Sequence, residues 1–406
     1  MIFKLTYHVI WWFLCIPMYF IRRHSKHLGG SYAELSGATI KSPCDIWIHA
    51  ASGGDVNTIR PTIQLLVPHA SILLTVNTRS GRDAARSIPG EISCHYRPLD
   101  HPLIVANFLK RLRPKLIVLE YLELWPGMLL AARAQRIPVI LINGRISAKT
   151  CRHIAKVKGF RRLILETLRY ACMRHVDDMS RIQELGVIDS QCTGNPKYDS
   201  IPRNDDYSAI PIEVPEKKPL IVHGSIHQDE FELACSAAKT AKAWAFAALA
   251  PRYPELAMNL QTRLTNAGVK STLLSAWDEC PDQPDAVVID QFGLLTKFYA
   301  NARLSIIYGS FGHRGGQNVL ESISAGSTTV FGPNMRNFSD IAKDLVDEGL
   351  AHQMTAQDLL SAIHRKVQWP PPDSGRVKEF IDRRRGATRK NADTIIQWLQ
   401  RTESPS

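Results

Sequence analysis

Short apolar strands alternate with amphipathic segments along most of this chain, and the alternation limits the folds that are open to it. In the first half the candidate strands cover residues 45–49, 72–76, 115–119 and 138–142. Helical patterns fall between them, for example over residues 103–112 and 126–134. Strands that alternate with helices predict an α/β fold, in which a parallel sheet is covered by helices.

The second half repeats this alternation after a polar, proline-bearing stretch over residues 201–218, which is the best candidate for a linker. Its candidate strands cover residues 219–223, 245–250, 286–290, 304–308 and 328–331. Further helices are expected near the C-terminus, over residues 377–385 and 392–400. A chain of 406 residues is long enough for two domains of ordinary size, so we expect two parallel-sheet domains.

A glycine-rich turn, GSFGHRGG at residues 309–316, follows one of these strands. We expect a helix over residues 317–325, with Asn318 and Glu321 on its first turn, where i and i+3 side chains can reach one ligand. Glycine lets the backbone approach a ligand, and a helix N-terminus offers unpaired N–H groups with positive partial charge. The stretch therefore predicts a phosphate seat, although a tight connection is an equally common use of such a turn.

Composition limits the kinds of partner that this chain is expected to bind. The chain is 45% hydrophobic and 22% charged, as globular proteins are, and its net charge of +12 favours anionic partners. No basic run with interleaved aromatic residues appears, so nucleic acid is not expected. The eight cysteines show neither CxxC nor a metal-ligand spacing, which predicts reduced thiols in a cytosolic compartment and no metal site.

The N-terminus carries an apolar and aromatic run, LTYHVIWWFLCIPMYFI, over residues 5–21. Its length is at the lower limit for a membrane span, and no small-residue cleavage site follows. Arg22, Arg23 and Lys26 come directly afterwards and favour keeping the rest of the chain on the cytoplasmic side. We expect a membrane-associated N-terminal helix on a cytosolic protein; the alternative is a helix buried in its own domain.

Polar residues follow the strands of the first half, where an open α/β sheet binds its ligands. Asp55 closes the loop HAASGGD, Glu123 lies in EYLELWP, and Ser147 ends NGRIS. Each has a structural alternative: Asp55 and Ser147 could cap helices, and Glu123 could favour the dipole of a helix that starts at Pro126. Together they predict a site for a polyhydroxylated acceptor.

The strand ends of the second half differ in chemistry. One loop carries Ser225 and His227, another carries Arg252, and a third is the glycine-rich turn. Small residues, a guanidinium and a glycine turn suit a nucleotide and its phosphate.

Two α/β domains with a linker and sites facing one cleft form the GT-B glycosyltransferase arrangement. From about residue 47 to 345 the chain also resembles the lipid A Kdo (3-deoxy-D-manno-octulosonic acid) transferases. Eleven motifs occur in order: HAASGGDV, LTVNTRSG, YRPLD, PKLIVLEYLELWPG, NGRIS, TGNPKYD, GSIHQDE, APRYPE, QFGLL, GGQNVLE and FGPNMRNF. The resemblance implies an inverting transfer of Kdo from CMP-Kdo to a lipid A precursor, in lipopolysaccharide synthesis at the cytoplasmic face of the inner membrane, with no cofactor.

The same resemblance divides the chain and implies roles on the acceptor side. It implies a membrane-anchor helix (1–28), a Rossmann-like acceptor domain (29–202), a Rossmann-like CMP-sugar domain (203–375) and C-terminal helices (376–406). Asp55 matches the family's general base, a glutamate, and Lys197 matches a lysine that stabilises the anionic transition state. Glu123 is retained, but Tyr121 stands where the family has a second carboxylate. Glu120 lies one position earlier and should point to the opposite side if the strand continues.

On the donor side the resemblance implies contacts with CMP or its sugar. The matching residues are Pro251 and Arg252 of a PR pair, Phe292, Gly293 and Leu294 of a segment that lacks the family's glutamate, Gly315 and Gly316, and Asn318, Val319, Leu320 and Glu321 of a helix start. Ser225 and His227 keep a GS-x-H turn that suits the phosphate or the Kdo carboxylate. Gln317 and Tyr253 replace two family histidines.

These substitutions leave two alternatives open. One is a divergent relative with another CMP-sugar donor or another acceptor, because Asp55, Tyr121, Tyr253, Leu294 and Gln317 all fall in functional motifs. The other is a catalytically inactive, membrane-attached protein that keeps the nucleotide site. The number of Kdo units transferred and the oligomeric state stay open.

Overall fold

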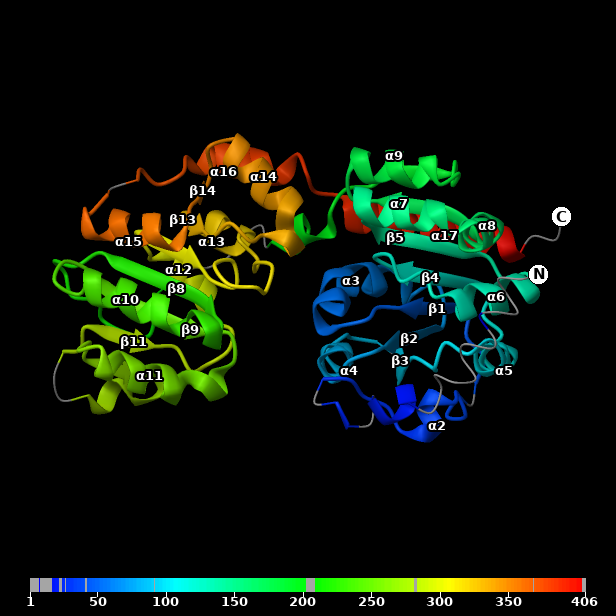
Figure 1. Ribbon diagram of the computed structural model, residues 1–406, viewed down its shortest axis with the longest axis horizontal. Coiled ribbons are helices and arrows are strands. Elements are labelled where there is room, and N and C mark those ends of the chain that lie inside the picture. Colours follow the sequence, from blue (N-terminus) through cyan, green and yellow to red (C-terminus); the bar gives the residue numbers. More distant parts are fainter. Residues whose placement is uncertain are drawn as a thin grey trace. The chain divides into compact units, whose positions relative to one another are not determined.

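The computed structural model describes residues 7, 17–21, 24–25, 27–40, 42–90, 92–201, 209–280, 283–367 and 369–403. The chain divides into two compact units: a first unit of Met1–Ser200 and Arg384–Ser406, and a second unit of Ile201–Arg383 (Figure 1). Most of the helix expected over residues 1–28 lies outside the described residues. Within the described ranges no helix is long and apolar enough to cross a membrane.

The first unit is built on a parallel sheet with the strand order β3-β2-β1-β4-β5-β6-β7. Its strands are β1 (Ile46–His49), β2 (Ile72–Val76), β3 (Ile92–Tyr96), β4 (Leu116–Glu120), β5 (Val139–Gly144), β6 (Leu168–Met173) and β7 (Ser190–Cys192). The four predicted strands are confirmed to within two residues at each end, whereas β3, β6 and β7 were not predicted.

Helices cover both faces of this sheet (Figure 1). They are α2 (Tyr32–Leu35), α3 (Gly53–Leu66), α4 (Arg79–Arg86), α5 (Pro102–Leu112), α6 (Pro126–Ala134), α7 (Ala148–Lys156), α8 (Lys158–Thr167), α9 (Val176–Glu184) and α17 (Ala387–Glu403). Alternate strand residues enter opposite cores: Ile46 and Ile48 pack with Val56 of α3, while Trp47 packs with Phe108 of α5.

The second unit repeats the plan with the strand order β10-β11-β9-β8-β12-β13-β14, again parallel throughout. The strands are β8 (Leu220–Ile226), β9 (Phe246–Pro251), β10 (Ser271–Leu273), β11 (Ala286–Val288), β12 (Leu304–Ile307), β13 (Thr328–Phe331) and β14 (His352–Gln353). The helices are α10 (Phe231–Ala241), α11 (Ala257–Asn266), α12 (Leu295–Ala300), α13 (Leu320–Ser324), α14 (Ser339–Asp347), α15 (Ala356–His364) and α16 (Ser374–Asp382). All five predicted strands are present, so the expected pair of Rossmann-like domains is confirmed.

The chain ends in the unit where it began. We expected the C-terminal helices to form a segment of their own, but α16 belongs to the second unit and α17 to the first. Ala392, Ile395 and Leu399 of α17 are buried in the core beneath α3. The hydrophobic face of α17 is therefore part of the first unit's core.

Both sheets have a point where the strand order reverses: between β1 and β4 in the first unit, and between β8 and β12 in the second. At such a point the connections leave toward opposite sides and open a crevice outside the carboxyl ends of the strands. The loops that follow β1, β4, β8 and β12 carry most of the residues predicted to be functional.

Candidate functional site

Asp55 lies in the first turn of α3, directly after β1. Its Oδ2 accepts hydrogen bonds from the Ser52 backbone N–H at 2.9 Å and from the Ser52 hydroxyl at 2.7 Å, and the Asp55 N–H points back to Ser52 Oγ at 3.4 Å. Asp55 is therefore not the N-cap that we considered: Ser52 is the N-cap of α3, and Asp55 is the third helical residue of its capping box. It also fixes the carboxylate at the reversal point of the sheet, so one role does not exclude the other.

Glu120, the last residue of β4, is fully buried at the same edge. Asn143 Nδ2 donates to its Oε1 at 2.6 Å, and Arg174 Nε donates in turn to Asn143 Oδ1. Burial and then the charge of Asp55 raise the pKa of Glu120 to about 8. We expected Glu120 to point to the opposite side if the strand continued, but β4 ends at Glu120, and the charges of Asp55 and Glu123 act on its carboxyl.

Glu120 follows Leu116 and Val118 on the α3 side of the sheet, and Tyr121 ends the strand directly after it. Its φ of +62° is left-handed, an uncommon conformation for a residue with a large side chain, so the extended backbone ends at Glu120. The Arg174 guanidinium lies 5.0 Å from the Tyr121 ring centre, and Arg145 Nη1 is 3.4 Å from the hydroxyl. Tyr121 is thus bracketed by two cations and contributes no carboxylate.

Glu123 takes part in a second buried cluster. Its Oε2 accepts a 2.6 Å hydrogen bond from Trp125 Nε1 and lies 3.5 Å from Nε2 of the buried His49. Burial by itself raises the pKa of Glu123, but His49, Trp125 and Arg97 outweigh it and hold that pKa below its usual range. Glu123 therefore stays ionised at neutral pH.

Helix α6 is capped by Asp100. The Asp100 carboxylate accepts the N–H groups of Gly127 and Met128 at 2.8 and 2.9 Å, whereas Glu123 was the residue predicted to favour the dipole of this helix. The guanidinium of Arg97 lies 3.6 Å from Asp100 and 3.9 Å from the Trp125 ring centre. Arg97 and Asp100 belong to the motif YRPLD. Their opposite charges are the sequence feature from which this contact could have been predicted.

Lys197 lies in the short turn η1 (Pro196–Tyr198), which packs against α3. Its N–H is held by Asn195 Oδ1 at 3.1 Å. Two residues on, the Asp199 carboxylate accepts the N–H groups of Gly386 and Thr388 at 2.6 and 2.7 Å, which fastens the turn to the start of α17. The turn that carries Lys197 and the helix that carries Asp55 are thus neighbours.

In the second unit, the glycine-rich turn departs from its prediction. The buried Glu230 carboxylate accepts the N–H groups of Gly309, Phe311 and Gly312 at 2.5, 3.0 and 3.2 Å. These N–H groups already hold an internal anion, so they are not the phosphate seat that we expected. The helix also begins later, at Leu320, because the Asn318 side chain accepts the Leu320 N–H at 3.2 Å.

The predicted donor residues nevertheless converge. Asn318 Nδ2 donates to Glu321 Oε1 at 2.9 Å, and Gln317 Nε2 lies 3.1 Å from His227 Nε2. Burial raises the pKa of Glu321 against the opposing effects of Asn318 and Arg252. Burial and then the nearby cations lower the pKa of His227, so its ring accepts from the Gln317 amide. Arg252, which follows β9, is exposed and free to meet a ligand anion.

Other predicted donor residues have different surroundings. Phe292 is 77% exposed and, with Gly293 and Leu294, forms the loop between β11 and α12. The side chains of Val319 and Leu320 are fully buried and belong to the core. Pro251 ends β9, and Ser225 has φ of +59° within β8. A Cβ at Gly315 or Gly316 would lie 2.8 Å from Asn337 or 2.5 Å from Met335, so close packing requires both glycines.

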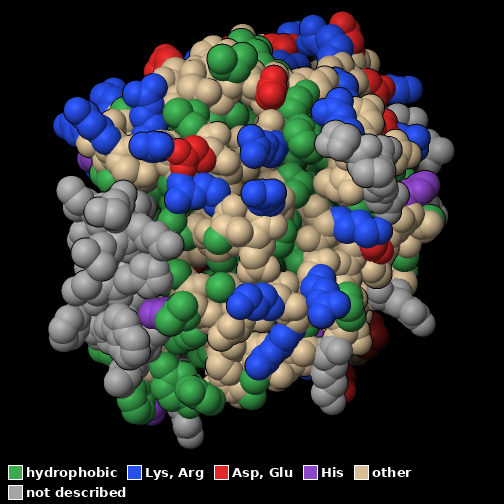
Figure 2. Space-filling view, turned by 90° about the vertical axis from the view of Figure 1, so that its right-hand side faces the viewer, with side chains coloured by type: hydrophobic (Ala, Val, Ile, Leu, Met, Phe, Trp, Pro, Cys, Tyr) green, Lys and Arg blue, Asp and Glu red, His purple; other side chains and the backbone are tan. Residues whose placement is uncertain are grey.

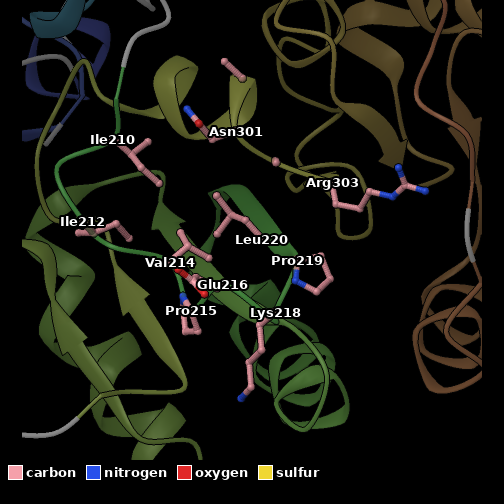
Figure 3. Close-up of a pocket in the computed structure, with 12 residues that line it drawn as sticks. Ile210, Ile212, Val214, Pro215, Glu216, Lys218, Pro219, Leu220, Asn301 and Arg303 are labelled. Carbon is pink, nitrogen blue, oxygen red and sulfur yellow. The ribbon is translucent and has the colours of Figure 1, made fainter.

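A hollow of about 590 Å³ lies at another place in the second unit (Figure 3). Ile210, Ile212, Lys218, Leu220 and Arg303 are among the residues that line it. They lie before or at the start of β8 and β12, at the amino ends of these strands, whereas the predicted donor residues lie at the carboxyl ends of strands. Among the described residues no group of three or more His, Cys, Asp and Glu side chains is placed to hold a metal ion.

Comparisons with known proteins agree with this organisation. The family model described as 3-deoxy-D-manno-octulosonic-acid transferase (kdotransferase) matches residues 22–200. A 3-deoxy-D-manno-octulosonic acid transferase of Bordetella pertussis is 27% identical and aligns over 93% of this chain and 95% of its own length. One from Rickettsia felis is also 27% identical, over 93% of this chain and 84% of its own.

Solved structures support the fold. The kitacinnamycin glycotransferase has a TM-score of 0.56 at 14% identity and covers 88% of this chain and 99% of its own. UDP-GlcNAc 2-epimerase from Neisseria meningitidis has a TM-score of 0.55 at 12% identity and covers 88% of this chain and 100% of its own. Because one neighbour is a transferase and the other an epimerase, these likenesses establish the two-domain fold and leave the activity to the site.

Proposed function

We propose that this chain is an inverting glycosyltransferase that moves Kdo from CMP-Kdo onto a lipid A precursor in lipopolysaccharide synthesis, because the 3-deoxy-D-manno-octulosonic-acid transferase family model matches residues 22–200 and two such transferases align with 93% of the chain. One observation carries the proposal beyond the family. The acidic group of Asp55, Glu120 and Glu123 lies at the carboxyl edge of one sheet, and Arg252, His227, Asn318 and Glu321 lie at the carboxyl edge of the other.

Asp55 is the proposed general base. An acceptor hydroxyl attacks the anomeric carbon of Kdo, the bond from that carbon to the phosphate oxygen of CMP breaks, and the hydroxyl proton passes to Asp55. The capping box engages Oδ2 alone, which leaves Oδ1 to receive the proton. Lys197 offsets the negative charge that develops on the departing phosphate. Because the resemblance places a longer glutamate here, the acceptor must sit closer to α3 than a glutamate would require.

The donor is proposed to bind at the second unit, with Arg252 meeting the phosphate and Asn318 and Glu321 the nucleoside of CMP. Glu230 supports this site indirectly by holding the glycine-rich turn. Arg252 supplies the positive charge for the phosphate, so no cofactor is part of the proposal.

We also propose attachment to the cytoplasmic face of the inner membrane. The N-terminal apolar run and the net charge of +12 support it. Lys and Arg side chains gather on the face of the first unit shown in Figure 2. Exposed basic residues end two helices of this unit: Lys110, Arg111 and Arg113 at α5, and Arg133 and Arg136 at α6.

The direct test is CMP release from CMP-Kdo in the presence of a tetra-acylated, bisphosphorylated lipid A precursor. We expect acceptor-dependent release by the natural chain. Release that is equally fast with a CMP-linked nonulosonic acid in place of CMP-Kdo would overturn the donor assignment. Tight CMP binding without transfer to any lipid A acceptor would identify a nucleotide-binding protein instead.

A second candidate is a transferase of the same fold with another acceptor. Tyr121 favours it, because the side chain that stands in place of a family carboxylate is bracketed by Arg174 and Arg145. Acceptor competition separates the candidates: a lipid A precursor that does not compete with the true acceptor would favour this second one.

A further inference from the structure

Tyr299 of α12 carries a hydroxyl that the proposed reaction leaves without a role. Its side chain is 1% exposed and is among the largest fully buried side chains of the described chain. The hydroxyl makes no hydrogen bond to any residue that the structure describes. Buried tyrosine hydroxyls usually have a partner, because a buried polar group without one costs free energy. The missing partner therefore comes from outside the protein, as a water molecule or as a ligand.

The position of the hydroxyl favours a ligand. A Cβ at Gly224 would lie 1.8 Å from the Tyr299 hydroxyl oxygen, so the hydroxyl occupies the space that a side chain at Gly224 would fill. The next residue, Ser225, has φ of +59° where β8 leaves the register of β9. A left-handed serine is strained, and such strain gathers at ligand sites. The hydroxyl thus ends beside the GS-x-H turn, which is part of the predicted donor site.

A carboxyl group of the donor site belongs to the same layer. Helix α12 packs against β8 and against α13, whose second residue is Glu321. Glu321 Oε1 accepts from Asn318 Nδ2 at 2.9 Å, which leaves Oε2 to accept from a ligand. Burial and then the charge of Glu321 raise the pKa of Tyr299 well above its ordinary value, so the hydroxyl stays neutral. The site therefore offers a neutral hydroxyl and a carboxyl oxygen.

This pair of groups suits a ligand hydroxyl better than an anion. One sugar hydroxyl can accept from Tyr299 and donate to Glu321, because a hydroxyl does both. A phosphate or carboxylate oxygen only accepts, and the charge of Glu321 would repel it. Within CMP-Kdo the hydroxyls nearest to the base are those of the ribose, and the proposed donor site assigns Glu321 to the nucleoside.

We propose that the Tyr299 hydroxyl binds a ribose hydroxyl of CMP and, together with Glu321, makes the donor site select CMP over a nucleotide that lacks this hydroxyl. Gly224 is then required, because a side chain at this position would displace the Tyr299 hydroxyl. The inference rests on the proposed function in that Glu321 meets the nucleoside of CMP.

The variant Tyr299→Phe removes the hydroxyl alone, and calorimetry with CMP, 2′-deoxy-CMP and 3′-deoxy-CMP tests the assignment. We expect the natural chain to bind CMP at least about tenfold more tightly than one of the two deoxynucleotides. In Tyr299→Phe this preference should fall below about threefold, through weaker binding of CMP. Tyr170→Phe, which removes a hydroxyl 3.4 Å from Gln191 in the first unit, should bind all three nucleotides as the natural chain does. A tenfold preference that persists in Tyr299→Phe would overturn the proposal.

Thermal unfolding separates ligand binding from a role in the fold. Because the Tyr299 hydroxyl has no protein partner, Tyr299→Phe should not lower the unfolding midpoint. Tyr308→Phe should lower it, because the Tyr308 hydroxyl lies 3.0 Å from His223 Nδ1. A destabilised Tyr299→Phe with unchanged CMP binding would assign the hydroxyl to the fold and contradict the proposal.

The same measurements distinguish this inference from the proposed function. If the natural chain prefers CMP through Tyr299 but transfers no Kdo, the role of Tyr299 stands and the proposed reaction fails. If the natural chain transfers Kdo but binds the three nucleotides equally, the proposed reaction stands and the role of Tyr299 is wrong.

Discussion

At the scale of single residues, Asp55 combines a structural and a chemical task. Its carboxylate closes the capping box of α3 through Ser52, and its charge raises the pKa of Glu120. Asparagine keeps an oxygen for the cap but cannot take a proton. For Asp55→Asn we predict a loss of transfer rate of about 10²–10⁴-fold, with unfolding free energy lowered by less than about 1 kcal/mol.

Steady-state CMP release and thermal unfolding check this prediction together. Asp83→Asn, the same change at an exposed residue paired with Arg86 on α4, is the matched control and should leave transfer unchanged. Near-normal transfer by Asp55→Asn would remove Asp55 as the base.

Glu230 invites a second prediction at this scale, because one carboxylate holds three N–H groups of the glycine-rich turn. Glutamine keeps one acceptor oxygen and places an N–H₂ group against backbone donors. We expect Glu230→Gln to lower unfolding free energy by about 1–3 kcal/mol and to weaken CMP binding, measured by calorimetry, by at least about tenfold. Glu232→Gln, at an exposed position two residues on, should change neither. Unaltered CMP binding in Glu230→Gln would show that the turn does not support the donor site.

At the scale of elements, one cap fixes the start of α17 in the first unit, in addition to the buried face of that helix. The Asp199 carboxylate holds the N–H groups of Gly386 and Thr388. For Asp199→Ala we predict that the free energy of unfolding falls by about 0.5–2 kcal/mol and that amide hydrogen exchange in α17 becomes faster. Asp373→Ala, which removes the N-cap of α16, should instead speed exchange in α16. Exchange in α17 that stays as slow as in the natural chain would contradict the role given to Asp199.

The helices and strands also show which parts of the fold can be predicted from the sequence. Buried strands such as β2 (ILLTV) and β13 (TTVF) were predicted at their observed bounds, because both faces of a buried parallel strand are covered and carry apolar or β-branched residues without charge. Strand β3 reads ISCHY and lies at the sheet edge, where partly exposed polar residues hide the pattern. The predicted phosphate seat failed for a different reason. Which anion occupies a glycine turn depends on Glu230, 79 residues away from Gly309 in sequence.

Glu120 lies two residues after Val118, so strand alternation places it on the α3 side of the sheet. The opposite side was expected only if the strand continued, and the left-handed backbone at Tyr121, which ends the strand, could not be predicted from the sequence. Sequence predicted that Asp55, Arg252, Asn318 and Glu321 follow the ends of strands, and the structure has them there. It missed the buried pair Arg97 and Asp100, whose value lies in contacts rather than in spacing.

At the scale of the whole molecule, acid stability should depend on His223. This residue is fully buried beside the Tyr308 hydroxyl, 3.0 Å from its Nδ1, and burial lowers its pKa from 6.5 to about 3. In the unfolded chain His223 is protonated below about pH 6.5. In the folded chain it stays neutral until the pH falls to about 3. Unfolding free energy therefore falls as the pH falls through this window, by about 1.4 kcal/mol per pH unit for this group.

We predict that His223→Gln, which keeps a hydrogen-bonding group for Tyr308, has a shallower dependence by about that amount per pH unit. Chemical denaturation at several pH values between these limits measures it, with the exposed His313→Gln as control. Equal slopes in the natural chain and His223→Gln would show that His223 is protonated in the folded state.

The whole molecule is proposed to join a donor site in one unit to an acceptor site in the other, and the lipid product reports on both at once. After incubation with CMP-Kdo and a tetra-acylated lipid A precursor, mass spectrometry should show the precursor heavier by one or more whole Kdo residues, with one CMP released for each. Asp55→Asn should leave the precursor at its starting mass over the same time. An unchanged precursor with the natural chain, under conditions in which CMP-Kdo remains bound, would contradict the proposal that this protein is a Kdo transferase acting on lipid A.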